Sequence, residues 1–263
     1  MNLRRVIRFL LFAVAIGTIL FSGSRLLGYY KETSEGAAIT RKLTETAVTP
    51  AVSSPSAMPK SGGQVEEEQY DEYAPYTVDF EALWAESENI VAWLYCEDTP
   101  INYPIVQGDD NEFYVEHLPD GTWNGVGTLF LDCVNEPDFS DFNSIIYGHN
   151  MLNDSMFGVL TDYYNQEYYE EHPVMYLMTP DQYYKVELVS GVVTPIDSWL
   201  YNLDFTNPAS KTAFVAELKE KSTFKPANNC TEEDHFLTLS TCTYDFDYAR
   251  YFLVGKLVKI GGA

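Results

Sequence analysis

Positively charged residues are scarce in this chain. Its 263 residues include 16 Lys and Arg against 39 Asp and Glu, which gives a formal net charge of −23. A nucleic acid is a polyanion that is bound through a basic surface, so this balance argues against nucleic acid as a partner. Residues 1–75 carry 8 basic and 8 acidic side chains, whereas residues 76–263 carry 8 and 31. The two parts are therefore expected to be different kinds of polypeptide.

Sequence patterns that hold metals are also missing. The chain has no CxxC pair, which argues against a zinc ribbon or a thioredoxin-like motif. It has no HExxH pattern and no Asp/Asn-rich calcium loop. Three of its four histidines, His117, His172 and His235, show no metal-ligand spacing. We therefore expect no metal and no other cofactor.

The four cysteines are far apart in the sequence. Cys96, Cys133 and Cys230 are expected to be structural thiols, and the polar neighbours of Cys230 predict an exposed position for it. An exported chain can form disulfides, but the spacing leaves open whether any two of these thiols meet.

An uncharged, mostly apolar run lies near the N-terminus, from Phe9 to Ser24. Its 16 residues are few for a membrane span. A span needs about 20 residues, but flanking arginines can extend the run by snorkelling, and Tyr29 and Tyr30 suit the membrane interface. The flanking arginines are Arg4, Arg5, Arg8 and Arg25.

The charge before this run sets the expected orientation. Positive residues on its N-terminal side predict a cytoplasmic N-terminus and an extracellular remainder, held in the cell membrane by a single span within residues 6–30. The alternative is a signal peptide that is cleaved before Arg25, after the small residues Ser22 and Ser24. The uncleaved anchor is favoured because the run is longer than a usual signal-peptide core.

The chain is expected to have three parts. Residues 1–31 form a cytoplasmic stub and membrane anchor. Residues 32–75 are rich in Thr, Ser, Ala, Pro, Gly and Glu without an apolar period, which predicts a flexible extracellular tether, since such a segment buries too little surface to offset its ordering entropy. Residues 76–263 alternate apolar runs with turn residues and form the folded domain.

This domain is rich in short runs typical of β-strands, with fewer helical segments. Eight strands and some helices inserted between them predict a mostly-β barrel, because the strands and helices do not alternate as in βαβ units. The expected strands are Ile90–Tyr95, Ile101–Val106, Gly127–Leu131, Ser144–Tyr147, Val174–Met178, Tyr183–Val193, Phe236–Ser240 and Tyr251–Ile260. The expected helices are Phe80–Ser87 with Asp79 as its N-cap, Asp109–His117, Asp154–Tyr164 and Ala209–Glu220.

Three polar residues lie at the ends of expected strands. His149 and Cys242 each follow an apolar run, and Arg250 opens the last strand. A thiolate is a strong nucleophile, an imidazole can move its proton, and a guanidinium can stabilise an oxyanion. The trio is therefore sufficient for acyl transfer without a metal. Taken singly, each also has an ordinary structural interpretation: a buried thiol, a turn histidine and a surface arginine.

The residues around this trio resemble the sortases, a family of bacterial cysteine transpeptidases. Thr238–Cys242 is similar to the TLxTC motif, Tyr147–Met151 to the block around the sortase histidine, and Arg250 to the arginine that follows the cysteine. The segment before Cys242, with its expected helix near residues 209–220, is similar to the helix-bearing loop of class B. Further blocks that resemble class B are Val78–Phe80, Ile90–Leu94, Ile101–Gln107 and the pair Asp110 and Asn111.

The resemblance implies a closed eight-stranded sortase-type β-barrel with an N-terminal helix and a helix-bearing loop before the Cys strand. It implies that Cys242 attacks the Thr–Gly bond, or its equivalent, of an LPxTG- or NPxTN-like sorting motif in a secreted protein. The thioacyl enzyme would then be resolved by a peptidoglycan amine, which anchors the protein to the cell wall. His149 would be the general acid/base and Arg250 the oxyanion donor. Residues expected to contact substrate are Thr241, Ser240, Asn150 and Tyr147.

Two alternatives remain at this point. The protein could be a cysteine peptidase that uses water as its acceptor, since the choice of acceptor depends on the shape of the cleft. It could also be a non-catalytic wall-associated binding domain in which Cys242 is a core residue. Papain-like cell-wall endopeptidases fit less well because their cysteine precedes the histidine, whereas here Cys242 follows His149.

Overall fold

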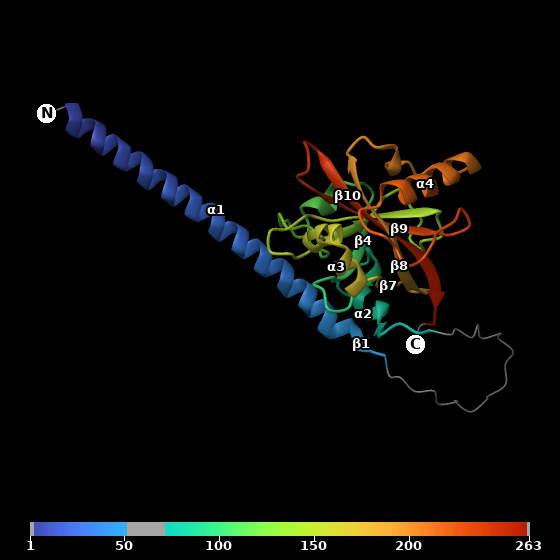
Figure 1. The fold of residues 1–263 in the computed structure, drawn as a ribbon. Helices are drawn as coiled ribbons and strands as arrows, with labels where there is room; N and C mark the ends of the chain where they lie inside the picture. Colours follow the sequence, from blue (N-terminus) through green and yellow to red (C-terminus); the bar gives the residue numbers. More distant parts are fainter. Residues whose placement is uncertain (1–2, 52–71, 262–263) are drawn as a thin grey trace.

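The computed structural model describes residues 3–51 and 72–261. A long helix, α1 (Leu3–Ala47), runs beside a β-barrel and continues far beyond it toward the N-terminus (Figure 1). The C-terminus lies at the end of the barrel away from the N-terminal part of α1, near the short strand that follows this helix. Residues 52–71 of the expected tether lie outside the described residues.

The barrel is closed and has eight strands in the order β10-β8-β7-β3-β4-β5-β6-β9. This confirms the predicted mostly-β barrel, and each of the eight expected strands is present with boundaries that are identical or differ by one or two residues. The strands are β3 (Ile90–Tyr95), β4 (Asn102–Gln107), β5 (Leu129–Leu131), β6 (Asn143–Tyr147), β7 (Val174–Met178), β8 (Tyr183–Pro195), β9 (Phe236–Cys242) and β10 (Ala249–Ile260).

Two parallel pairs set the position of the site. β4 pairs with β5 and β6 pairs with β9 in parallel, while the other neighbours in the barrel are antiparallel. In the β6–β9 pair, Tyr147 lies opposite Ser240. Because parallel strands end at the same edge of a sheet, the residues that follow Tyr147 and those that end β9 meet at one rim of the barrel.

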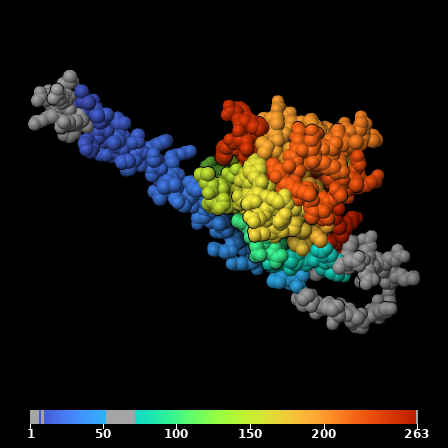
Figure 2. Space-filling model, in the orientation of Figure 1, coloured from blue at the N-terminus to red at the C-terminus, as the bar shows by residue number. Residues whose placement is uncertain are grey.

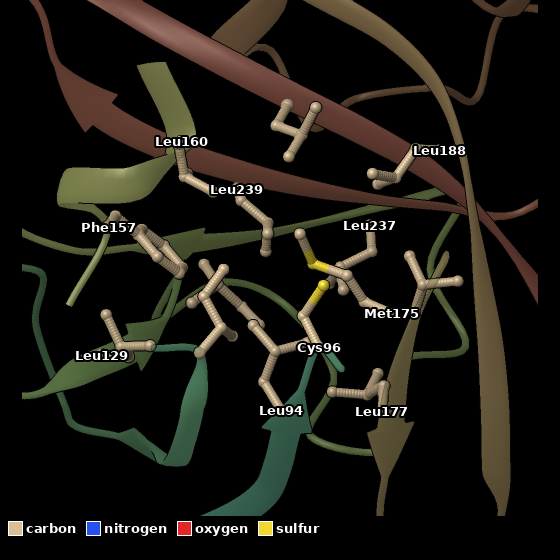
Figure 3. Packing of buried hydrophobic residues seen from close by; sticks show 14 of the residues in the cluster. Leu94, Cys96, Leu129, Phe157, Leu160, Met175, Leu177, Leu188, Leu237 and Leu239 are labelled. Carbon is tan, nitrogen blue, oxygen red and sulfur yellow. The ribbon is translucent and has the colours of Figure 1, made fainter. Parts of the chain in front are cut away.

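The barrel interior is filled by leucine-rich side chains from all around the sheet (Figure 3). Leu237 and Leu239 of β9 point inward, whereas Phe236, on the other face of the strand, packs with a cluster under the helix α4 (Pro208–Lys221). Because side chains alternate along a strand, Cys242 shares the outer face with Phe236 and Ser240. The nucleophile candidate is therefore outside the barrel core.

The other thiols have different surroundings. Cys96 is buried in the barrel interior beside Met175 (Figure 3), and Cys133 is half-buried. Cys230 is only 2% exposed, so the predicted exposed position is wrong. Its polar sequence neighbours do not prevent burial, because the segment folds back over Phe236 and the helix α4. Each of the four cysteines is a free thiol.

The helices confirm some local signals and correct others. α2 (Phe80–Trp84) begins at Asp79, whose carboxylate accepts a hydrogen bond from the Ala82 amide at 3.0 Å, as expected for an N-cap. α4 (Pro208–Lys221) is capped by Asn207 and buries Phe214 and Leu218. The other helical segments are η1 (Phe113–Val115), η2 (Gly158–Tyr164), α3 (Gln166–Glu171) and η3 (Trp199–Tyr201).

The predicted helices at 109–117 and 154–164 are too long. The first is a single 3₁₀ turn and the second a 3₁₀ helix that begins at Gly158. Asp110 accepts hydrogen bonds from the amides of Glu112 and Phe113, and this local turn competes with helix formation earlier in the segment. Asp154 and Met156 have φ angles of 61° and 54°, which ends any right-handed helix there.

The N-terminal helix extends far into the expected tether. α1 continues to Ala47, and β1 (Val48–Pro50) pairs with β2 (Tyr76–Val78), so the prediction of a flexible tether is wrong for residues 32–50. The reason is a short stripe of apolar residues, Leu43 and Ala47 with the half-buried Ile39, which packs against α2 and β4. The stripe is spaced every four residues, as on one face of a helix, but it is too short to stand out from its polar surroundings.

Residues 10–27 of α1 are almost entirely exposed, whereas Gly36 is buried and the Glu32 carbonyl accepts a hydrogen bond from Asn124. The helix is long and apolar enough to cross a membrane, and no part of its apolar window is buried. These are the properties of a membrane anchor and also of a signal sequence.

Candidate active site

A cleft of about 430 Å³ opens at the barrel rim where β6 and β9 end. Its wall brings together all three residues of the predicted trio. The cleft is lined by Asn111, Val115, Thr128, Phe130, Tyr147, Gly148, His149, Ile196, Tyr201, Ser240, Thr241, Cys242 and Arg250.

Strand pairing places Arg250 beside Cys242. The two residues are direct partners across the antiparallel β9–β10 pair. Side chains of such partners point to the same face, with Cβ atoms about 5 Å apart. Both side chains are partly exposed, and Arg250 donates one hydrogen bond, from Nη1 to the Ala249 carbonyl at 3.0 Å. The remaining guanidinium N–H groups are oriented by no other protein acceptor in the described structure and are available to a ligand beside the thiol.

His149 follows β6 and is held at the rim by the loop before β5. Its Nε2 lies 2.9 Å from the Val115 carbonyl oxygen. A carbonyl only accepts hydrogen bonds, so Nε2 donates and carries the proton. In the neutral ring Nδ1 is then the free acceptor, which is the state required of a base. The adjoining Gly148 is fixed to β9, since its amide donates to Ser240 and its carbonyl accepts from Thr241 Oγ1 at 2.8 Å.

The four predicted substrate contacts all lie near the trio, but their side chains make hydrogen bonds within the protein. Asn150 is outside the cleft lining, and its Nδ2 donates to the Cys242 carbonyl at 2.8 Å. Thr241 bonds to Gly148, and Ser240 Oγ shares a 3.0 Å hydrogen bond with the Tyr201 hydroxyl. Tyr147 donates to Asp132 at 2.7 Å. These bonds join β6, β9 and the neighbouring loops into a fixed wall.

Asp132 is a buried carboxylate that sequence reasoning missed. It is 6% exposed and accepts hydrogen bonds from Tyr147 and, at 3.0 Å, from Asn111 Nδ2. Burial and this neighbouring carboxylate raise the pKa of Tyr147, so the phenol stays protonated and continues to donate. Asn111 is part of the block that resembles class B sortases, which was the available signal for its place in the cleft.

Tyr201 lines the cleft but has no signal in the sequence. It comes from η3 and stacks on Tyr147 with ring centroids 6.3 Å apart. Burial raises the pKa of Tyr201, while its hydrogen bond to Ser240 and the charge of Arg250 oppose the rise. The segment between β8 and β9 therefore contributes an aromatic wall next to the guanidinium.

Gly127 fixes the loop that holds His149. Its φ is +64°, and a Cβ there would lie 2.6 Å from the Tyr114 carbonyl oxygen and closer still to that of Val115. We expect Gly127→Ala to cost about 1–3 kcal/mol in free energy of unfolding and to lower turnover, because the Val115 carbonyl must move away from His149. Denaturant unfolding and peptide-cleavage rates measure both effects.

Gly121 provides the matched control. It lies in the same loop with φ +81°, but a Cβ there meets no atom within 4 Å. Gly121→Ala should cost about 1–2 kcal/mol from the left-handed backbone alone and leave turnover unchanged. Equal losses of turnover in the two variants would contradict a role for the Val115 carbonyl.

No group of three or more His, Cys, Asp or Glu residues suited to a metal occurs within residues 3–51 and 72–261. His117, His172 and His235 lie apart, and each has its Nδ1 within hydrogen-bond distance of a backbone carbonyl.

Comparison with known proteins agrees with this geometry. The sequence profile of the sortase domain matches residues 94–258. Sortase B of Staphylococcus aureus (strain NCTC 8325 / PS 47) is 32% identical over 183 residues, which is 69% of this chain and 75% of the relative. The chain belongs to the class B sortases. It is thus a cysteine transpeptidase of the cell-wall sorting type.

Other sortases support the same assignment. Sortase B of Listeria monocytogenes serovar 1/2a (strain ATCC BAA-679 / EGD-e) is 32% identical over 174 residues, covering 65% of this chain and 71% of the relative. The solved S. aureus sortase B–substrate complex has a TM-score of 0.66 at 32% identity, covering 69% of this chain and 85% of that one. Sortase B of Bacillus anthracis has a TM-score of 0.70 at 28% identity, covering 88% and 99%.

Proposed function

We propose that this sortase cleaves an LPxTG- or NPxTN-like sorting motif through Cys242 and transfers the acyl group to a peptidoglycan amine. The observation that carries the proposal is the direct cross-strand pairing of Cys242 with Arg250, in one cleft with His149. The pairing places a permanent positive charge beside the nucleophile, where an oxyanion would form.

The proposed reaction has two acyl-transfer steps. His149 Nδ1 takes the Cys242 proton, and Sγ attacks the carbonyl carbon of the motif's threonine. The C–N bond to the next residue breaks, and His149 returns the proton to the leaving amine. An acceptor amine then attacks the thioester and forms a new amide bond, and the C–S bond breaks to release Sγ. His149 takes the proton that the amine loses and returns it to Sγ. Arg250 stabilises the oxyanion in both steps.

The choice of substrate and acceptor has support from relatives. A solved sortase B with a TM-score of 0.66 to this chain is complexed with triglycine, and another is a substrate complex. A glycine peptide has a free α-amine, which is the group that the second step needs. We infer that the partners of this chain are secreted proteins with a sorting signal and a peptidoglycan precursor amine.

One experiment tests this function against its alternatives. The full chain is incubated with a panel of sorting-motif peptides, with and without triglycine, and the products are identified by mass. We expect cleavage after threonine and a shift of the product from free acid to triglycine conjugate. Free acid alone would make the protein a hydrolase. The alternative of a non-catalytic wall-binding domain would be favoured if no peptide were cleaved and if thiol alkylation left wall binding unchanged.

We further propose that residues 1–31 remain as a membrane anchor, with a cytoplasmic N-terminus and the domain over residues 76–263 outside the cell. The exposed apolar window of α1 and the arginines before it support this orientation.

The anchor makes a direct prediction about the mature N-terminus. The membrane-bound protein should begin at Met1 or Asn2, because an uncleaved span keeps its cytoplasmic residues. Protein purified from membranes is sequenced from its N-terminus. A mature protein that begins at Arg25 would instead establish a cleaved signal peptide and a domain released from the membrane.

A further inference from the structure

Three exposed aromatic residues lie on the loop between β9 and β10. Tyr244 is 81%, Tyr248 76% and Phe246 47% exposed, immediately after Cys242 and before Arg250. The loop is held in place, since Asp245 accepts hydrogen bonds from the Tyr164 and Thr243 hydroxyls. Tyr248 has φ 61°, a conformation that costs a side-chain-bearing residue about 1–2 kcal/mol. The fold therefore holds these rings in solvent although their burial would be favourable.

A fourth exposed aromatic residue, Trp123, lies next to a residue that contacts α1 shortly after Tyr29 and Tyr30. Trp123 is 57% exposed and precedes Asn124, whose Nδ2 donates to the Glu32 carbonyl of α1 at 3.1 Å. Glu32 follows Tyr29 and Tyr30 by two to three residues, which is about 3–5 Å along a helix. Trp123 thus lies close to the end of the apolar part of α1.

The loop faces the side toward which the apolar part of α1 runs. β10 begins at Ala249 on that side of the barrel and ends near the C-terminus on the other (Figure 1). In the space-filling view the loop stands out from the domain on the same side (Figure 2). Trp and Tyr are the residues enriched where a protein meets the membrane–water interface.

We propose that Trp123, Tyr244, Phe246 and Tyr248 form a membrane-contacting rim that rests on the outer surface of the phospholipid bilayer. The proposal depends on the membrane anchor proposed above. With 31 acidic and 8 basic residues in residues 76–263, the domain is repelled by anionic lipid, so the contact is made by partition of the rings and not by charge. The cleft then opens toward the headgroups and favours a substrate and an acceptor that are held at the membrane.

The test uses the full chain in phosphatidylcholine liposomes, with the photoreactive residue p-benzoylphenylalanine in place of Tyr244 or Tyr248. Tyr73 is the matched control: it is 59% exposed and bridges to Gly261 at the other end of the barrel. Leu20, within the apolar run, reports on the anchor. We expect lipid crosslinking at positions 244, 248 and 20, several-fold above position 73, with no rise at the loop positions when phosphatidylglycerol is added.

Other outcomes would overturn the proposal in distinguishable ways. Crosslinking at position 20 but at neither loop position above the level of position 73 would remove the rim and keep the anchor. Absence of crosslinking at position 20 would remove both. A rise with phosphatidylglycerol would replace ring partition with charge attraction. Cleavage of a soluble peptide by the same liposomes reports separately on the proposed enzymatic function.

Discussion

Replacing Cys242 with alanine should abolish peptide cleavage while the barrel stays folded. Cys242 is the one cysteine among the residues that line the cleft, and the proposed reaction forms its acyl bond through that thiolate. Cys242 lies at the end of β9 on the outer face and is only partly buried, so loss of its sulfur leaves no cavity in the barrel interior. Cleavage rates are measured by product mass, and folding by circular dichroism and thermal melting.

Cys133 supplies the control for this variant. It is a free thiol of intermediate exposure, like Cys242, and desolvation together with the negative charge of the preceding Asp132 raises the Cys133 pKa. A raised pKa reduces the thiolate fraction at neutral pH, so Cys133→Ala should cleave at the wild-type rate. If Cys242→Ala also retained that rate, the assignment of the nucleophile would be wrong.

Replacing Arg250 with alanine should lower turnover by about 10²–10³, the usual cost of losing one oxyanion donor. Its direct pairing with Cys242 places the guanidinium beside the thiol that attacks the carbonyl in the proposed reaction. The melting temperature should change little, because Arg250 makes one hydrogen bond, to the adjacent Ala249 carbonyl. Arg250→Lys keeps the charge but loses the planar fork, so it should recover only part of the rate.

Lys259 is a matched cation on the same strand. It is exposed on β10, far from Cys242, and Lys259→Ala should leave both turnover and stability within the small range usual for surface residues. A full-rate Arg250→Ala enzyme would reduce the catalytic set to Cys242 and His149. An unfolded Arg250→Ala protein would make the arginine structural and leave backbone N–H groups near Cys242 as the oxyanion donors.

Local patterns in the sequence were sufficient for the strands and for two helix starts. The eight runs that became β3 to β10 alternate or bury both faces over five or more residues in most cases, a signal that needs no distant partner. Asp79 and the Asn207–Pro208 pair also act on the amides that directly follow them. Where the local signal was ambiguous, as over 109–117 and 154–164, side-chain bonds to nearby amides and left-handed residues shortened the helices.

Residues at strand ends and the resemblance to sortases were sufficient to select His149, Cys242 and Arg250, since strand ends project at a barrel rim. The sequence could not show that Cys242 and Arg250 are direct cross-strand partners, nor that the Val115 carbonyl holds the His149 ring. It also could not show Tyr201 in the wall of the cleft or Asp132 bonded to the wall residues Tyr147 and Asn111, because a buried carboxylate or tyrosine has no period or spacing of its own.

The sequence by itself thus determined the strand content, the apolar N-terminal run, the acidic character of the domain and the identity of three residues at the rim. The tertiary structure alone decided the burial of Cys230, the docking of α1 through residue 47, and the geometry around His149. The physical reason is range: propensity, capping and period-2 burial act within a few residues, whereas these features depend on contacts between segments that are tens to more than one hundred residues apart.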